Sequence, residues 1–196
     1  MRGQPAAAAS FPSPQRVRVR WKIFLFLFGF GFIAYVQQRS LTIASYRMMP
    51  DLGFSQMQIG WLEQALLIGY TFMQFPGGVL GQRLGSRLTF VVIGLIAFAA
   101  CLVTPLAPIL LQGAALFGGL LAVQLVLGAS QAPIFPVSSG VFEAWFTPDR
   151  WPVVQGLQSL GLGLGASLTP PLIAWLMTAF DWRRALLWTT LPGLLL

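Results

Sequence analysis

Residues 78–87 read Gly-Val-Leu-Gly-Gln-Arg-Leu-Gly-Ser-Arg, a short stretch with two arginines that separates two long apolar runs. An α-helix needs about 20 mostly apolar residues to cross roughly 30 Å of hydrocarbon, and apolar runs of that length recur on both sides of this stretch. Of the 196 residues, 56% are hydrophobic and only 9% are charged, whereas soluble domains have about 25% charged residues. The sequence therefore predicts an all-α, polytopic membrane protein.

Outward from residues 78–87, alternating apolar runs and polar breaks predict six helices in one transmembrane bundle, residues 21–196. The helices lie at about residues 21–46, 56–80, 88–106, 111–146, 153–179 and 185–196. We expect Pro105 and Pro108 to end the third helix, and Pro133 and Pro136 to bend the long fourth one. The sixth helix is incomplete because it is too short to cross a bilayer. We therefore expect this sequence to be the front portion of a longer protein.

The charged residues indicate an orientation. Residues 1–20, rich in Ala, Pro and Ser, predict a disordered tail with several arginines. Basic residues are more frequent there and in the breaks at 81–87 and 147–152 than in the breaks at 47–55 and 181–184. By the positive-inside rule, we expect a multi-pass protein of a bacterial inner or plasma membrane with a cytoplasmic N-terminus. The net charge of +7 then reflects orientation in the lipid bilayer, and we expect no nucleic-acid partner.

The composition excludes several classes of enzyme. The chain has one cysteine, Cys101, and no histidine. A zinc site, a Ser-His-Asp triad and a Cys-His dyad therefore cannot be built within it. We expect no catalytic residue, no metal and no cofactor.

Arg39 is the charged residue that stands out within the predicted first helix, between Gln38 and Ser40. A charge at the centre of a membrane helix costs at least about 2.5 kcal/mol on insertion scales, so such a residue is a functional candidate. At helical spacing Tyr35 and Tyr46 share its face. A guanidinium in a water-filled cavity would bind a carboxylate through two parallel hydrogen bonds. Alternatively, Arg39 lies near the outer end of its helix and reaches the lipid headgroups.

Polar residues also form single stripes on two further helices. Glu63, Tyr70 and Gln74 share one face of the second helix, and Gln124 and Gln131 share one face of the fourth. Polar side chains at this depth need partners. Either they form hydrogen bonds between helices, or they line a cavity for a solute or water.

The stretch from Gly78 to Arg87 resembles the loop signature G-x-L-A-D-R-x-G-R-R of the major facilitator superfamily, with Gln82 in place of the Asp. The resemblance implies that this link latches one state of a transport cycle. The gating residues that it implies are Gly78, Gln82, Arg83, Gly85 and Arg87.

The resemblance extends to the anion:cation symporter branch of that superfamily. The matching stretches are Gln38-Arg39, Gly69-Tyr70 with Gln74, residues 128–136, Trp145-Phe146 and Trp182-Arg183. It implies the N-terminal six-helix bundle of a twelve-helix secondary transporter that carries a small organic anion, a carboxylate or sugar acid, by alternating access. The partner would be a C-terminal six-helix half, or a second copy of this chain. The substrate-binding residues that it implies are Arg39, Gln38, Tyr70, Gln74, Gln124 and Gln131.

The sequence departs from the pattern of that branch at three positions. Members usually have Asp, Arg and Glu where this chain has Gln38, Gln124 and Gln131. Because glutamine does not titrate, these positions do not support proton coupling through this half. Two other interpretations follow: a truncated, inactive relic of a transporter, or a membrane scaffold that does not transport.

Overall fold

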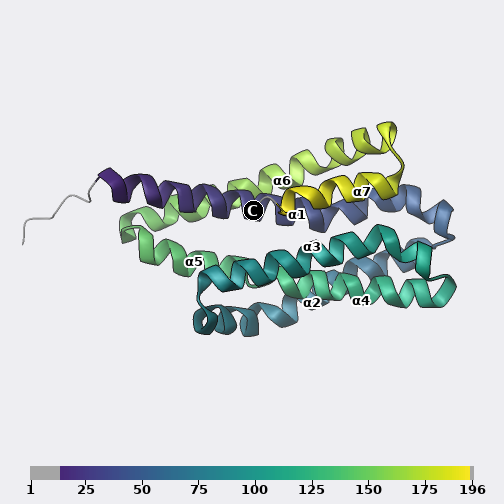
Figure 1. Cartoon of the computed structure of the whole chain (residues 1–196), viewed down its shortest axis with the longest axis horizontal. Helices are drawn as coiled ribbons and strands as arrows, with labels where there is room; N and C mark the ends of the chain where they lie inside the picture. Colours follow the sequence, from purple (N-terminus) through teal and green to yellow (C-terminus); the bar gives the residue numbers. More distant parts are fainter. Residues whose placement is uncertain (1–13, 195–196) are drawn as a thin grey trace, which may run out of the picture.

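The computed structural model describes residues 14–194, and in this part of the chain all regular structure is helical. Its elements run nearly parallel along one long axis (Figure 1). In order they are α1 (Pro14–Leu52), α2 (Gln56–Leu84), α3 (Ser86–Leu110), α4 (Gly113–Gln131), α5 (Ile134–Trp145), the short 3-10 helix η1 (Pro148–Arg150), α6 (Trp151–Ala179), α7 (Trp182–Thr190) and the 3-10 turn η2 (Leu191–Leu194).

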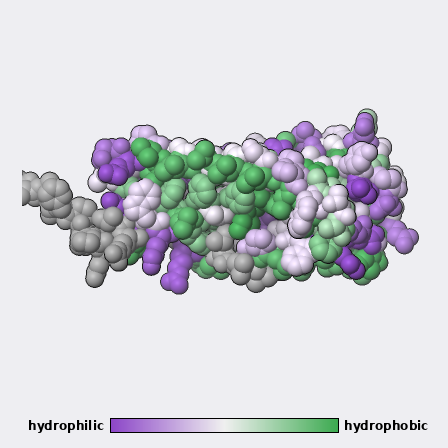
Figure 2. Space-filling view, turned by 90° about the horizontal axis from the view of Figure 1, so that it is seen from above, coloured by the Kyte–Doolittle hydropathy of each residue, from purple (hydrophilic) through white to green (hydrophobic). Residues whose placement is uncertain are grey.

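The surface and the helix lengths are those of a multi-pass membrane protein. Four segments are long and apolar enough to cross a bilayer: Val19–Leu52, Ser86–Leu110, Gly113–Trp145 and Pro148–Ala179. In Figure 2 hydrophobic side chains cover the middle of the visible face, and hydrophilic ones gather toward both ends. With α4 and α5 counted as one interrupted helix, and with α2 and the short α7 added, the predicted six-helix bundle is confirmed.

Helix α2 packs on α4 and α5 through glycines. A side chain at Gly69 would collide with the backbone of Leu125, and one at Gly128 would collide with the backbone of Leu66. Further along α2, Gly77 lies against Pro133, so close contact continues past the end of α4. Small residues let backbones approach closely, which is how membrane helices associate without a hydrophobic driving force.

Helix α1 packs on α6 in the same way. Gly161 lies against the ring of Phe28, and Gly165 lies against the Cβ of Tyr35 at 3.1 Å from where its own Cβ would be. The spacing Gly161-x-x-x-Gly165 is the small-residue pattern of close helix pairs. This contact brings the side of α1 that carries Phe28 and Tyr35 against α6.

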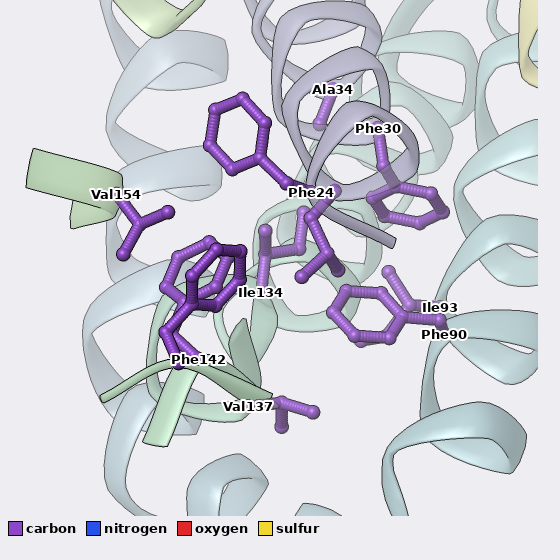
Figure 3. Packing of buried hydrophobic residues seen from close by; sticks show 11 residues of the cluster. Phe24, Phe30, Ala34, Phe90, Ile93, Ile134, Val137, Phe142 and Val154 are labelled. Carbon is purple, nitrogen blue, oxygen red and sulfur yellow. The ribbon is translucent and has the colours of Figure 1, made fainter. Parts of the chain in front are cut away.

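Two apolar clusters stabilise the ends of the bundle. The cluster in Figure 3 joins α1, α3, α5 and α6, with the rings of Phe30 and Phe90 edge to face at 5.1 Å. A second cluster joins α1, α2, α3, α4 and α7 and includes Met48 and Trp182. There the indole nitrogen of Trp182 donates a hydrogen bond to the Asp51 carboxylate over 2.7 Å.

Helix α1 is longer than predicted at both ends. Residues 14–20, predicted to belong to the disordered tail, are helical, and residues 1–13 lie outside the described residues. Apart from Pro14, which is tolerated in a first helical turn, this stretch has no residue that breaks a helix. At the other end α1 runs through Pro50, so the predicted turn at 47–55 is reduced to the residues around Gly53, whose φ is +68°.

The prediction that Pro105 and Pro108 end the third helix is wrong, because α3 continues through both to Leu110. Each proline removes one backbone donor from the helix. Within a membrane bundle, side-chain hydroxyls and neighbouring helices make that loss tolerable. The carbonyls that lose a donor in this way are those of Cys101 and Thr104, four residues before each proline.

The remaining boundaries differ at the breaks. The bend predicted in the fourth helix is an interruption at Ala132 and Pro133, between α4 and α5. The predicted link 81–87 is reduced to Gly85. The predicted turn at 181–184 is shorter, because α7 already begins at Trp182 behind Asp181. The predicted sixth helix is therefore α7, followed by η2, and residues 195–196 lie outside the described part.

Candidate functional site

Arg39 lies on an exposed face of α1. Its Nε donates a hydrogen bond to the hydroxyl of Tyr35 over 3.3 Å, and its guanidinium carbon lies 5.3 Å from the centre of the same ring. Tyr35, one turn before Arg39 in the helix, therefore holds the charged side chain through both its ring and its hydroxyl. In the described part of the chain no hydrogen bond joins Arg39 to a carboxylate, so its positive charge faces outward without such a partner.

A second polar contact crosses the interior of the bundle. Nε2 of Gln131 donates a hydrogen bond to Oε1 of Gln37 over 3.2 Å, and the two side chains are 1% and 5% exposed. Gln131 is the last residue of α4, directly before the interruption at Ala132 and Pro133. The hydrogen bond therefore connects α1 to the junction between α4 and α5. Gln131 thus forms the kind of hydrogen bond between helices that was considered for it from the sequence.

Several buried polar atoms have no protein partner among the described residues: Gln124 Oε1, Gln131 Oε1, Gln158 Nε2 and Ser138 Oγ. A buried polar atom left without a hydrogen bond costs about 1–3 kcal/mol. Next to Gln37 and Gln131 lies a cavity of about 20 Å³, also lined by Gly193, and roughly 10–15 Å³ is enough for one water. Beside Gln131 the bundle therefore has both an unpaired polar atom and the room for a water molecule.

The other predicted substrate-binding residues are spread over the bundle. Gln124 is buried, Gln38 and Tyr70 are half-buried, and Gln74 is exposed on α2. In the described residues no hydrogen bond joins any of them to Arg39. That they line one cavity with Arg39 stays a prediction.

The predicted gating residues do not form a loop. Gly78, Gln82 and Arg83 lie within α2, and Arg87 lies in the first turn of α3. Gly85 alone joins the two helices, with φ +82° and ψ 150°, a conformation that is essentially restricted to glycine. Its amide donates to the Gly81 carbonyl over 3.1 Å. The link is therefore a one-residue corner, and its role as a latch stays a prediction.

A larger groove, of about 800 Å³, adjoins the small cavity beside Gln37 and Gln131 and shares Gly193 with it. It runs between the N-terminal parts of α1 and α3 and the C-terminal part of α5, and its walls are apolar apart from Ser86 and Arg87. Arg39 and the buried glutamines do not line it. The groove has the larger volume but apolar walls, whereas the polar side chains lie elsewhere. The region around Arg39 therefore suits a polar solute better than the groove does.

The sequence singled out Gln38 and not its neighbour Gln37. In the structure the buried residues of α1 recur every three or four positions, and Gln37 occupies one of them. The series is Leu27, Phe30, Ala34, Gln37, Leu41, Ala44 and Met48. A polar side chain on the buried stripe of a membrane helix needs a partner on another helix.

Comparison with protein families places most of the chain in one of them. Residues 23–196 match the family model described as Major Facilitator Superfamily. The hexuronate transporter of Bacillus subtilis (strain 168) is 29% identical over 163 residues, which cover 83% of this chain and 37% of that protein. The D-galactonate transporter of Escherichia coli O6:H1 is 26% identical over 151 residues, 77% of this chain and 34% of that protein. The chain thus spans little more than a third of the length of these relatives.

A solved structure supports the fold. A bacterial homolog of the human lysosomal transporter Spinster, in an inward-facing and unoccupied conformation, superimposes with a TM-score of 0.70 at 17% identity. The match covers 94% of this chain and 42% of that one. The helices described here are therefore arranged as in part of a larger transporter.

Proposed function

The chain belongs to the Major Facilitator Superfamily, and on that basis we propose that it forms the N-terminal half of a secondary transporter for a small organic anion. The anion is a carboxylate or a sugar acid, and it crosses a cell membrane by alternating access. In facilitators of this architecture two bundles rock about a site near the middle of the bilayer. The second wall of that site comes from a C-terminal bundle or from a second copy of this chain.

The observation that carries the proposal is the exposed guanidinium of Arg39, held by Tyr35. An arginine presents a planar fork of donors that matches a carboxylate in two parallel hydrogen bonds. Because no carboxylate of the described chain occupies this fork, an anionic solute can. The names of the relatives support the same chemistry, since hexuronate and galactonate are carboxylates.

In this proposal the other polar residues recognise the uncharged part of the anion. Gln38, Tyr70 and Gln74 are accessible or half-accessible, and carboxamides and a phenol can both donate to and accept from sugar hydroxyls. Gln124 and Gln131 form the polar interior behind them. Gly85 and the neighbouring basic residues at the α2–α3 corner act at the cytoplasmic gate, with the N-terminus on the same side.

The test is uptake of radiolabelled hexuronate and galactonate by cells or vesicles that contain the expressed protein. We expect Arg39→Gln to abolish saturable uptake of both sugar acids. The matched control is Arg47→Gln, which removes an exposed arginine from the same helix and should leave uptake near the wild-type level. Equal uptake by Arg39→Gln and wild type would contradict the assignment of Arg39.

A complete absence of uptake from the wild-type protein, correctly inserted and folded together with its second bundle, would contradict transport itself. The scaffold and relic interpretations would then explain the helical fold without a solute.

A further inference from the structure

Three elements meet around the side chain of Gln37. Its oxygen accepts the hydrogen bond from Gln131 at the end of α4. Its amide nitrogen faces η2, where a Cβ at Gly193 would come within 2.8 Å of it. Within α1, Ser40 donates to the backbone carbonyl of Gln37 over 2.9 Å. The side chain of Gln37, a polar residue in an apolar stripe, is thus bonded to α4 and lies against η2.

We infer that the Gln37–Gln131 hydrogen bond is a positioning device that fixes the rotation of α1 against the α4–α5 interruption, and thereby the direction in which Arg39 points. Arg39 follows Gln37 by two residues, so a change of α1 rotation moves both together. One residue of an α-helix corresponds to a rotation of about 100°, and a small rotation is enough to redirect a long side chain.

The Gln37–Gln131 hydrogen bond, called the tie below, restrains the direction of α1 more than apolar packing does. Apolar contacts along the buried stripe of α1 tolerate sliding, because they have no preferred angle, whereas a hydrogen bond weakens steeply when its angle departs from linear. The tie also attaches to α4 where the helix is interrupted, so the α4–α5 joint and the Arg39 turn are coupled. Both partners are carboxamides, which do not titrate, so the tie is independent of pH.

The stability test uses leucine, which has nearly the shape of glutamine without its polar atoms. We expect Gln37→Leu and Gln131→Leu each to lower the melting temperature of the detergent-solubilised protein by roughly 5 °C, because each strands a buried carboxamide. The double variant should return close to the wild-type value, since both polar groups are gone. Gln74→Leu, at an exposed site, is the matched control and should cause no shift.

Single variants as stable as wild type, or a double variant as unstable as the sum of the singles, would overturn the tie. The difference between wild type and Gln131→Leu should also be the same at about pH 5 and about pH 8. A difference that changes with pH would contradict a contact between two neutral groups.

The positioning role needs a separate readout, the reaction of Arg39 with phenylglyoxal followed by mass spectrometry of the peptide that contains it. In the stable double leucine variant we expect the labelling rate of Arg39 to rise several-fold, because α1 has lost its directional restraint. An unchanged rate in the double variant would show that the pair is structural only.

The transport consequence rests on the function proposed above. In the double variant we expect the KM for the sugar acid to rise several-fold, with the maximal rate per folded molecule little changed. Uptake with the wild-type KM would contradict positioning of Arg39. If the wild-type protein transports neither sugar acid, the proposed function fails, while the melting and labelling experiments still decide whether the tie exists.

Discussion

Tyr35 accepts a hydrogen bond from Arg39 over 3.3 Å, and the Cβ atom of Tyr35 packs against α6 at Gly165. One residue thus connects a helix–helix contact with an exposed charge. Its ring also lies 5.3 Å from the guanidinium carbon, so the hydroxyl and the aromatic face can be tested separately.

Replacing Tyr35 with Phe removes the hydroxyl and keeps the ring. The lost hydrogen bond is worth about 0.5–1.5 kcal/mol, so we expect the KM for the anion to rise about two- to tenfold with no change in melting temperature. Uptake kinetics and thermal unfolding of the same preparation measure both. A fall in melting temperature as large as that of a packing variant would show that the hydroxyl is structural.

Gly165→Val should separate α1 from α6. The new side chain would meet Tyr35 and Phe32, and overpacking of this kind costs about 1–3 kcal/mol. Gly163→Val is the matched control, because a Cβ there meets nothing within 4 Å. We expect a lower melting temperature for the first variant and a smaller change for the second. Equal melting temperatures of the two variants would show that α1 and α6 are not closely packed at Gly165.

Gly128→Ala tests the contact between α2 and α4. Its Cβ would collide with the backbone of Leu66, which cannot move aside as a flexible side chain can. We expect little folded protein on size-exclusion chromatography. Gly60→Ala, on α2 in open space, should be neutral or stabilising by up to about 1 kcal/mol. Normal expression and stability of Gly128→Ala would contradict the close crossing.

Gly85→Ala tests backbone strain at a position where the added Cβ would not collide with any neighbouring atom. A Cβ at Gly85 meets no atom within 4 Å, but the backbone has φ +82°. Holding a residue other than glycine there costs about 1–3 kcal/mol, so the melting temperature should fall. Gly140→Ala, within α5 and in open space, is the control for glycine replacement. Equal melting of the two variants would show that the corner relaxes.

Trp182→Phe should loosen the link between the end of α1 and the start of α7. It removes the donor to Asp51 and leaves most of the buried ring. A hydrogen bond to a charged group contributes about 1.5–3 kcal/mol, so we expect a clear fall in melting temperature. Asp51→Asn keeps an acceptor oxygen and should have a smaller effect. A larger fall in melting temperature for Asp51→Asn than for Trp182→Phe would contradict the assigned role of the indole donor.

Much of the fold could be predicted because membrane helices are encoded locally. The six helical segments and the break in the fourth one near Pro133 followed from residues close together in the chain. The helix ends were the weak point. Prolines at 105 and 108 were expected to stop a helix, but in a bundle neighbouring groups compensate for the donors that they remove.

The candidate site was only partly predictable. Arg39 was identified from its charge alone, since any charge in a membrane helix is costly. Its contact with Tyr35 was foreseen as a shared helix face. The pairing of Gln131 with Gln37 was not foreseen, because three adjacent polar residues, Gln37 to Arg39, face three different directions, and spacing within one helix does not say which direction is inward.

The sequence by itself determined that this protein is a helical membrane protein, where its helices lie and which residues carry unusual polarity. These properties follow from hydropathy and from the allowed backbone conformations of Gly and Pro, both of which act within a few residues. Only the tertiary structure decided that Gln37 is buried and that Arg39 is exposed. Each helix turns by about 100° per residue, so the direction of each side chain depends on contacts with residues far away in the chain, such as Gly165 and Gln131 for α1 and Gly128 for α2.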